Sequence, residues 1–300
     1  YADSNVGGIS MDFFTGQELI GACKEKALPI SEIMKLREMT AGSLSSEEID
    51  SKLETVLSIM KNAATRPLLH PGKSIGGLIG GEAKKVNDHG KTTSCVCGSM
   101  LSKAISYSMA VLEVNASMGL IVAAPTAGSS GVVPGVLLAM QDEHGLSDEK
   151  LYQGLLNASA IGYLLMRNAS VSGAEAGCQA EVGAASAMSA SAIVEMMGGT
   201  PHMCLTAASL ALSNLLGLVC DPIAGLVESP CQSRNAIGVA NAITSAELAL
   251  SGISHPIPFD EMAEAMFRVG KSLPFELRET AMGGCAGTPT GCKLGCEICK

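Results

Sequence analysis

The chain has 300 residues, a formal net charge of −9, 47% hydrophobic residues and 16% charged residues. Because charged residues usually make up about 25%, this composition excludes an intrinsically disordered chain. The acidic balance, without a basic stripe, disfavours a nucleic-acid partner, because phosphate binding needs Lys and Arg in excess.

The first residues, YADSNVGGIS, are polar and do not form a signal peptide. We therefore expect a cytoplasmic protein whose eleven cysteines are thiols or metal ligands rather than a disulfide framework. Two stretches, 114–141 and 196–220, lack charge, but the first is broken by Gly and Pro and the second carries polar residues. They are typical of buried helices in a large domain, so we expect no membrane span.

Helix signals recur along the whole chain. Thr15 is expected to cap a first helix that ends near Pro29, and Ser31 to cap a second that stops at Gly42. Ser45 and Ser46 precede a longer helix, followed by a Gly/Pro-rich loop over 66–81. Further helices are expected over about 99–120, 135–145, 147–170, 181–199, 200–220, 235–251 and 260–271.

No convincing strand pair is visible, and aromatic residues make up only 3% of the chain. The abundance of Ala, Leu and Met favours helices over a β-sandwich. We expect one mainly helical domain over 1–300, with a weak seam near 85–98. The tail, about 284–300, is rich in cysteine and is expected to be irregular and flexible.

The cysteines fall into groups that differ in their surroundings. Those in or beside apolar patterns are expected to be small buried hydrophobic residues; they are Cys23, Cys95, Cys97 and Cys204. Three others lie at helix ends or in turns among Gly, Pro and carboxylates, and they are Cys178, Cys220 and Cys231.

The second group has the surroundings that metal-ligating thiolates need, because backbone N–H groups there stabilise charge on sulfur. Three thiolates do not complete a closed tetrahedral zinc site. They would leave one corner of a cubane cluster open for substrate. From the residues alone, buried thiols without metal remain the alternative.

The tail carries the spacing C-x3-C-x2-C at Cys292, Cys296 and Cys299. Radical enzymes that bind an iron–sulfur cluster and S-adenosylmethionine share this spacing. Here it lies at the extreme C-terminus with no barrel after it, so the sequence context disfavours that function.

Three segments together resemble a known family: NASVSGAEAGCQAEVG, GLVCDPIAGLVESPCQSRN and APTAGSSGVVPG. They are similar to the α chain of the iron–sulfur-dependent bacterial L-serine dehydratases, and the resemblance covers about residues 30–290. It implies a [4Fe–4S] cluster held by Cys178, Cys220 and Cys231. It also implies a helical bundle around a buried central helix, with the cluster held by loops and helix ends.

The resemblance implies an L-serine ammonia-lyase, a carbon–oxygen lyase of amino-acid degradation and gluconeogenesis. The reaction is β-elimination of L-serine to pyruvate and ammonia, in which the open iron acts as a Lewis acid on the hydroxyl. No pyridoxal phosphate is expected. L-threonine or L-cysteine are alternative substrates, and a non-catalytic iron–sulfur regulatory or scaffold subunit is the alternative function. Some members carry a β domain that this chain lacks, so we expect a separate β subunit in a hetero-oligomer.

A Gly/Ser loop is the candidate for binding the serine carboxylate, because its backbone amides could form an anion nest. Its residues are Thr126, Ser129, Ser130 and Gly131. The alternative interpretation is an ordinary turn between helices.

Two cations are further candidates for the active site. Lys84 follows the loop SIGGLIGG and would lie near the substrate, unless it belongs to a solvated helix. Arg278 could bind a carboxylate through two hydrogen bonds, or a neighbouring helix end. The general base is not assigned by the sequence.

Four cysteines after residue 284 depart from many relatives, which have one there. Cys299, the penultimate residue, is a candidate for a fourth ligand of the open iron when no substrate is bound. The alternative is a disordered tail whose thiols face solvent.

Overall fold

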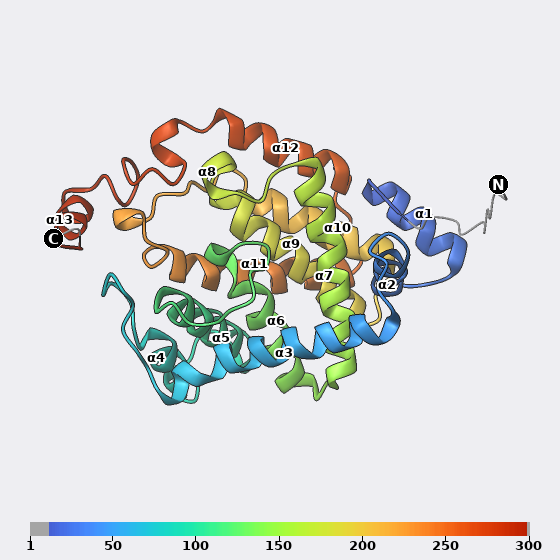
Figure 1. Cartoon of the computed structure of the whole chain (residues 1–300), viewed down its shortest axis with the longest axis horizontal. Coiled ribbons are helices and arrows are strands. Elements are labelled where there is room, and N and C mark those ends of the chain that lie inside the picture. Colours follow the sequence, from blue (N-terminus) through green and yellow to red (C-terminus); the bar gives the residue numbers. More distant parts are fainter. Residues whose placement is uncertain (1–11, 299–300) are drawn as a thin grey trace, which may run out of the picture.

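The structure, a computed structural model, describes residues 12–298 and is built almost wholly from helices (Figure 1). Within these residues no strand forms, although an isolated parallel bridge joins Cys220 and Arg278. The prediction of a mainly helical fold is confirmed.

The α-helices, in chain order, are α1 (Gly16–Lys26), α2 (Ile30–Thr40), α3 (Ser46–Leu69), α4 (Glu82–His89), α5 (Gly98–Ala116), α6 (Val132–His144), α7 (Asp148–Asn168), α8 (Gly173–Ala176), α9 (Ala184–Met196), α10 (Pro201–Asn214), α11 (Cys231–Leu250), α12 (Phe259–Ser272) and α13 (Pro289–Ile298). Shorter turns of 3₁₀ or π geometry are η1 (Ala127–Ser129), η2 (Gln179–Gly183), η3 (Ile223–Gly225) and η4 (Phe275–Leu277).

Several helices begin where the sequence predicts, because a hydroxyl side chain satisfies a free backbone N–H group there. The Thr15 hydroxyl accepts a hydrogen bond from the N–H of Glu18 at the start of α1. Ser45 and Glu48 form a reciprocal capping box at the start of α3. Thr200 likewise caps α10.

The predicted cap at Ser31 is wrong. The capping position of the second helix is Pro29, two residues earlier, and Ser31 lies inside the helix, fully buried. Its backbone N–H donates to the carboxylate of Glu195, 3.2 Å away. A residue far along the chain therefore satisfies the N–H group, which a local capping rule does not anticipate.

Other boundaries also differ from the prediction. Helix α3 runs on through Pro67 to Leu69, since Pro67 is buried and its packing outweighs the lost hydrogen bond. Helix α10 ends at Asn214 rather than near 220, and α11 starts at Cys231 rather than Asn235. The tail is not irregular throughout, because α13 forms there and packs against η3.

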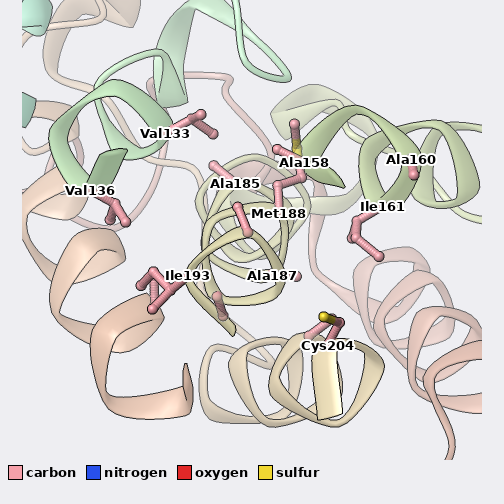
Figure 2. Close-up of a cluster of buried hydrophobic side chains, with 14 of the residues drawn as sticks. Val133, Val136, Ala158, Ala160, Ile161, Ala185, Ala187, Met188, Ile193 and Cys204 are labelled. Atoms are coloured by element: carbon pink, nitrogen blue, oxygen red, sulfur yellow. The ribbon is translucent and has the colours of Figure 1, made fainter. Parts of the chain in front are cut away.

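Helix α9 lies in the middle of the molecule, against α6, α7, α10 and α11 (Figure 1). Of its residues only Glu195 is not buried. Small side chains on α9 let its neighbours approach closely. Figure 2 shows Ala185, Ala187, Met188 and Ile193 of α9 among Val133, Val136, Ala158, Ile161 and Cys204.

Helices α1 and α13 lie at opposite ends of the long axis (Figure 1). Within residues 12–298, no helix is long and apolar enough to cross a membrane. The prediction that Cys97 is buried is wrong, and Cys95 is only half-buried, because both lie in the exposed turn before α5.

Candidate metal centre

Three chain segments bring cysteines to the interior near the α13 end of the molecule. Cys178 directly precedes the π-helical turn η2, Cys220 pairs with Arg278 in the isolated bridge, and Cys231 is the first residue of α11. All three side chains are buried. Each therefore lies at an end of regular structure, as the sequence predicts.

Glycine is required where the chain turns into the first of these segments. Gly177 has a φ of +77°, and a Cβ there would lie 2.7 Å from the carbonyl oxygen of Leu218. Gly173 approaches the site so closely that a Cβ would lie 3.0 Å from the Cys220 sulfur. Larger residues at these positions would displace the cysteine loops.

The centre of the site is a group of two sulfurs and one carboxylate. The Sγ atoms of Cys178 and Cys220 and a carboxylate oxygen of Glu181 all lie within 4.8 Å of one another. The Oε2 atom of Glu181 lies 3.9 Å from the Cys178 sulfur and 3.8 Å from the Cys220 sulfur. Such a set of buried donors can hold a metal ion.

Burial and crowding make negative charge unfavourable in this group. Burial raises the pKa of Glu181. A hydrogen bond with Cys178, together with burial, raises the pKa of Cys220. Cys231 does not belong to this group of three; burial, then the charges of Cys178 and Glu181, raises its pKa. A cation bound here would stabilise negative charge on these buried groups and release protons from the thiols, which fits a metal–thiolate centre.

One cation already faces the group. Nη1 of Arg234 donates to the Cys178 sulfur at 3.5 Å and to the carbonyl oxygen of Val219 at 2.7 Å. Nη2 forms an ion pair with Oδ1 of Asp221 at 2.6 Å. Positive charge is thus supplied to the thiol of Cys178 by α11.

The Gly/Ser loop lies against the same group. The Thr126 hydroxyl donates to Oε1 of Glu181 at 2.7 Å and lies 3.2 Å from the Ser129 hydroxyl. The amide of Asn235 holds the loop from the other side, donating to the Gly128 carbonyl at 2.8 Å and accepting from the Gly131 N–H at 3.1 Å. The Gly131 amide is therefore already occupied, and the Ser130 hydroxyl donates to the Ala127 carbonyl.

Residues beside Cys231 hold two more segments near the site. The buried carboxylate of Glu228 accepts hydrogen bonds from the Ser74 hydroxyl and from the backbone of Gly76 and Leu78. Gln232 donates to Glu113 of α5 at 3.1 Å. Glu228 and Gln232 thus tie the loop of residues 74–78 and helix α5 to the start of α11.

The two predicted cations differ in their positions. Arg278 lies beside Cys220 through the backbone bridge, and its Nε atom is buried without a hydrogen-bond partner in the described residues. Lys84 is exposed on α4, where it pairs with Asp88. Cys299, the candidate fourth ligand, lies outside the described residues.

Sequence reasoning missed Asp221, Glu228, Arg234 and Asn235. A signal was present, because these polar residues stand within the cysteine-bearing segment 220–235 of a chain that is otherwise poor in charge. The three-dimensional partners of these residues lie up to 154 positions away, so their roles were not visible locally.

The helical fold defines a protein of the all-α class, and its buried Cys178, Glu181 and Cys220 form a group that could hold a metal ion. Comparison with known proteins gives the family: the model "Serine dehydratase alpha chain" matches residues 25–286, and the chain belongs to this family.

Named relatives are of two kinds. The chain is 46% identical over 282 residues to a probable L-serine dehydratase alpha chain of Bacillus subtilis, covering 94% of each. It is 44% identical to the L-serine dehydratase alpha chain of Peptoniphilus asaccharolyticus, covering 95% of this chain and 98% of that one. It is 36% identical to L-serine dehydratase 2 of Escherichia coli, covering 90% of this chain but 60% of that longer protein.

Proposed function

We propose that this chain catalyses the β-elimination of L-serine to pyruvate and ammonia with a [4Fe–4S] cluster bound by Cys178, Cys220 and Cys231. The observation that carries the proposal is the buried group of Cys178, Glu181 and Cys220, in a chain of this family. Relatives at 44% and 46% identity are named as L-serine dehydratase alpha chains, which supports serine as the substrate.

The donor set fits an iron–sulfur cluster better than a hard cation, because thiolates prefer soft or borderline metals. Three thiolates leave one iron without a protein ligand. When bound, the cluster supplies a Lewis-acidic iron for the serine hydroxyl, which is otherwise a poor leaving group.

The chain's own residues would bind and orient the substrate. The Gly/Ser loop lies next to Glu181, and the hydroxyls of Thr126 and Ser129 would bind a polar substrate by exchanging the hydrogen bonds that they make with Glu181 and with each other. Ser130 and Gly131, with their side-chain and backbone bonds already made, would instead keep the loop in shape. The unpartnered Nε of Arg278 is a donor for the serine carboxylate.

Lys84 would have to leave its ion pair with Asp88 to reach a substrate. Cys299 would be a fourth ligand in the resting state, displaced when serine binds.

We place the enzyme in the cytoplasm, within amino-acid degradation leading to gluconeogenesis. The designation "alpha chain" of the relatives supports a separate β subunit in a hetero-oligomer.

The test is anaerobic purification of the chain, alone and together with its β chain, followed by measurement of iron, sulfide and pyruvate released from L-serine. L-threonine and L-cysteine are assayed beside it. We expect about four irons per chain, activity that is lost in air and regained with ferrous iron and thiol, and no absorbance of a pyridoxal imine.

Two results would contradict the proposal. A chain without iron that still releases pyruvate would remove the cluster from the reaction. A full cluster without lyase activity, in the presence of the β chain, would favour a regulatory or scaffold subunit instead.

A further inference from the structure

Arg234 lies on the same face of α11 as Cys231, because the two residues are three positions apart on a helix. Its side chain is only 14% exposed, and its guanidinium points at Cys178 rather than at solvent. A charged group this far from water must be compensated by nearby acceptors or negative charge.

The compensation comes from the other two cysteine segments. Val219 and Asp221, the residues on either side of Cys220, accept from or pair with the guanidinium at 2.7 Å and 2.6 Å. The Cys178 sulfur, at 3.5 Å, is the third partner. One side chain therefore connects the segments of Cys178 and Cys220 with the helix that carries Cys231.

Asp221 fixes the direction of the guanidinium. Its side chain is 3% exposed, and its second oxygen, Oδ2, accepts the backbone N–H of Cys285 at 2.6 Å. Neither Asp221 nor Arg234 can turn away without leaving a buried charge unpaired. Lysine could not replace this contact pattern, since a single ammonium lacks the planar fork of donors.

We propose that Arg234 is a positioning residue for the cluster: it donates a hydrogen bond to the sulfur of Cys178, sets that sulfur relative to Cys220, and raises the reduction potential of the bound cluster. The inference rests on the proposed function, because it needs a cluster at these cysteines. Hydrogen bonds and positive charge near a ligand sulfur favour the reduced cluster, which carries more negative charge.

The experiment compares Arg234→Gln, Arg234→Lys and the unchanged protein with its β chain, all purified anaerobically. Arg268→Gln is the matched control, since Arg268 is exposed on α12 and pairs only with its helix neighbour Glu264 in the described structure. The measurements are iron and sulfide content, the EPR spectrum of the reduced cluster, its reduction potential and the chelator concentration that removes half of the iron.

We expect Arg234→Gln to shift the reduction potential of the cluster to more negative values and to change its EPR spectrum. The chelator concentration that removes half of the iron should fall about 10- to 100-fold. Arg234→Lys keeps the charge, so its reduction potential should lie between those of Arg234→Gln and the unchanged protein. Its iron should still be removed at a lower chelator concentration than in the unchanged protein. Arg268→Gln should match the unchanged protein in every measurement.

If Arg234→Gln does not retain enough cluster for spectroscopy, Arg234→Lys and Asp221→Asn provide the test, because Asp221→Asn keeps the arginine but removes the charge that directs it. Potential, EPR spectrum and chelator resistance equal to those of the unchanged protein would overturn the role of Arg234 while leaving the proposed function intact. Absence of a cluster from the unchanged protein would overturn both.

Discussion

Two groups of buried cysteines lie in this molecule, and only one of them has the surroundings of a metal site. Cys23 and Cys204 belong to the hydrophobic core, inside α1 and α10. Burial, with a contribution from Glu195, raises the pKa of Cys23 to about 12. Cys178, Cys220 and Cys231 are as deeply buried, but they stand at the ends of regular elements. Arg234 donates to the Cys178 sulfur, and Glu181 lies beside Cys178 and Cys220.

The comparison shows that burial does not distinguish a structural thiol from a ligand. Cys204 has neutral and acidic polar neighbours: the amide of Asn157 donates to its sulfur at 3.9 Å, and Glu195, after burial, contributes to raising its pKa. At the candidate metal centre, the guanidinium of Arg234 donates to the Cys178 sulfur, and the carboxylate of Glu181 lies beside Cys178 and Cys220. What makes the site is the arrangement of polar partners around the sulfur.

The largest effect should come from removing a proposed ligand. We expect Cys178→Ala, Cys220→Ala and Cys231→Ala each to lose most iron and sulfide and nearly all pyruvate formation, because each leaves the cluster with one thiolate fewer. The measurement is anaerobic iron and sulfide analysis with an L-serine assay.

Cys204→Ala is the control for these variants, because it removes an equally buried sulfur from the core. It should keep its cluster. Full cluster content in one of the three site variants would exclude that residue from the ligand set and weaken the distinction between the two groups.

A smaller effect should come from the amide that holds the Gly/Ser loop. Asn235→Ala leaves the carbonyl of Gly128 and the N–H of Gly131 without their partner, at a cost of about 1–3 kcal/mol for each buried group. We expect kcat/KM for L-serine to fall by up to about 100-fold through a misplaced loop. Steady-state kinetics, normalised to iron content, measure this change.

Asn241→Ala is the matched control on the same helix. Asn241 also donates to a backbone carbonyl, that of Ala211, and accepts from Asn214, but it lies in the core rather than at the site. It should lower thermal stability and leave kcat/KM per cluster unchanged. Equal kinetic losses in both variants would mean that Asn235 acts only through general stability.

The smallest effect concerns reactivity in the core. With a pKa raised from 9.0 to about 12, Cys23 has about a thousandfold less thiolate at pH 8. We expect iodoacetamide to label Cys23 and Cys204 far more slowly than the exposed Cys97 and Cys296. Peptide mass spectrometry measures the labelling rate at each cysteine, with a denatured sample as the reference. Fast labelling of Cys204 would contradict its assignment to a closed core.

Sequence rules for helix caps were sufficient where hydrogen bonds between neighbouring residues determine the start of a helix. The helix starts at Thr15 and Ser45 depend on hydrogen bonds to residues three positions away, so the sequence was sufficient. The cysteines stood out by their flanking Gly, Pro and carboxylates, and the structure brings Cys178 and Cys220 together. Their role as cluster ligands stays a prediction.

Contacts between distant segments set the limit of sequence reasoning. Arg234 reaches Cys178 across 56 positions and Asn235 reaches Gly128 across 107. The helix of the tail was missed for a related reason, because α13 packs against η3. A helix of this length is marginal in isolation and depends on such tertiary packing.

The loop that carries Cys220 is completed by the end of the chain. Cys220 donates its N–H to the carbonyl of Leu277, its own carbonyl accepts from Glu279, and Asp221 accepts from Cys285. During synthesis the cysteines therefore leave the ribosome well before the segment that fixes one of them. Under the proposed function, cluster assembly would therefore follow the synthesis of residues 277–285, and a chain that lacks this segment would leave the Cys220 loop without these three hydrogen bonds.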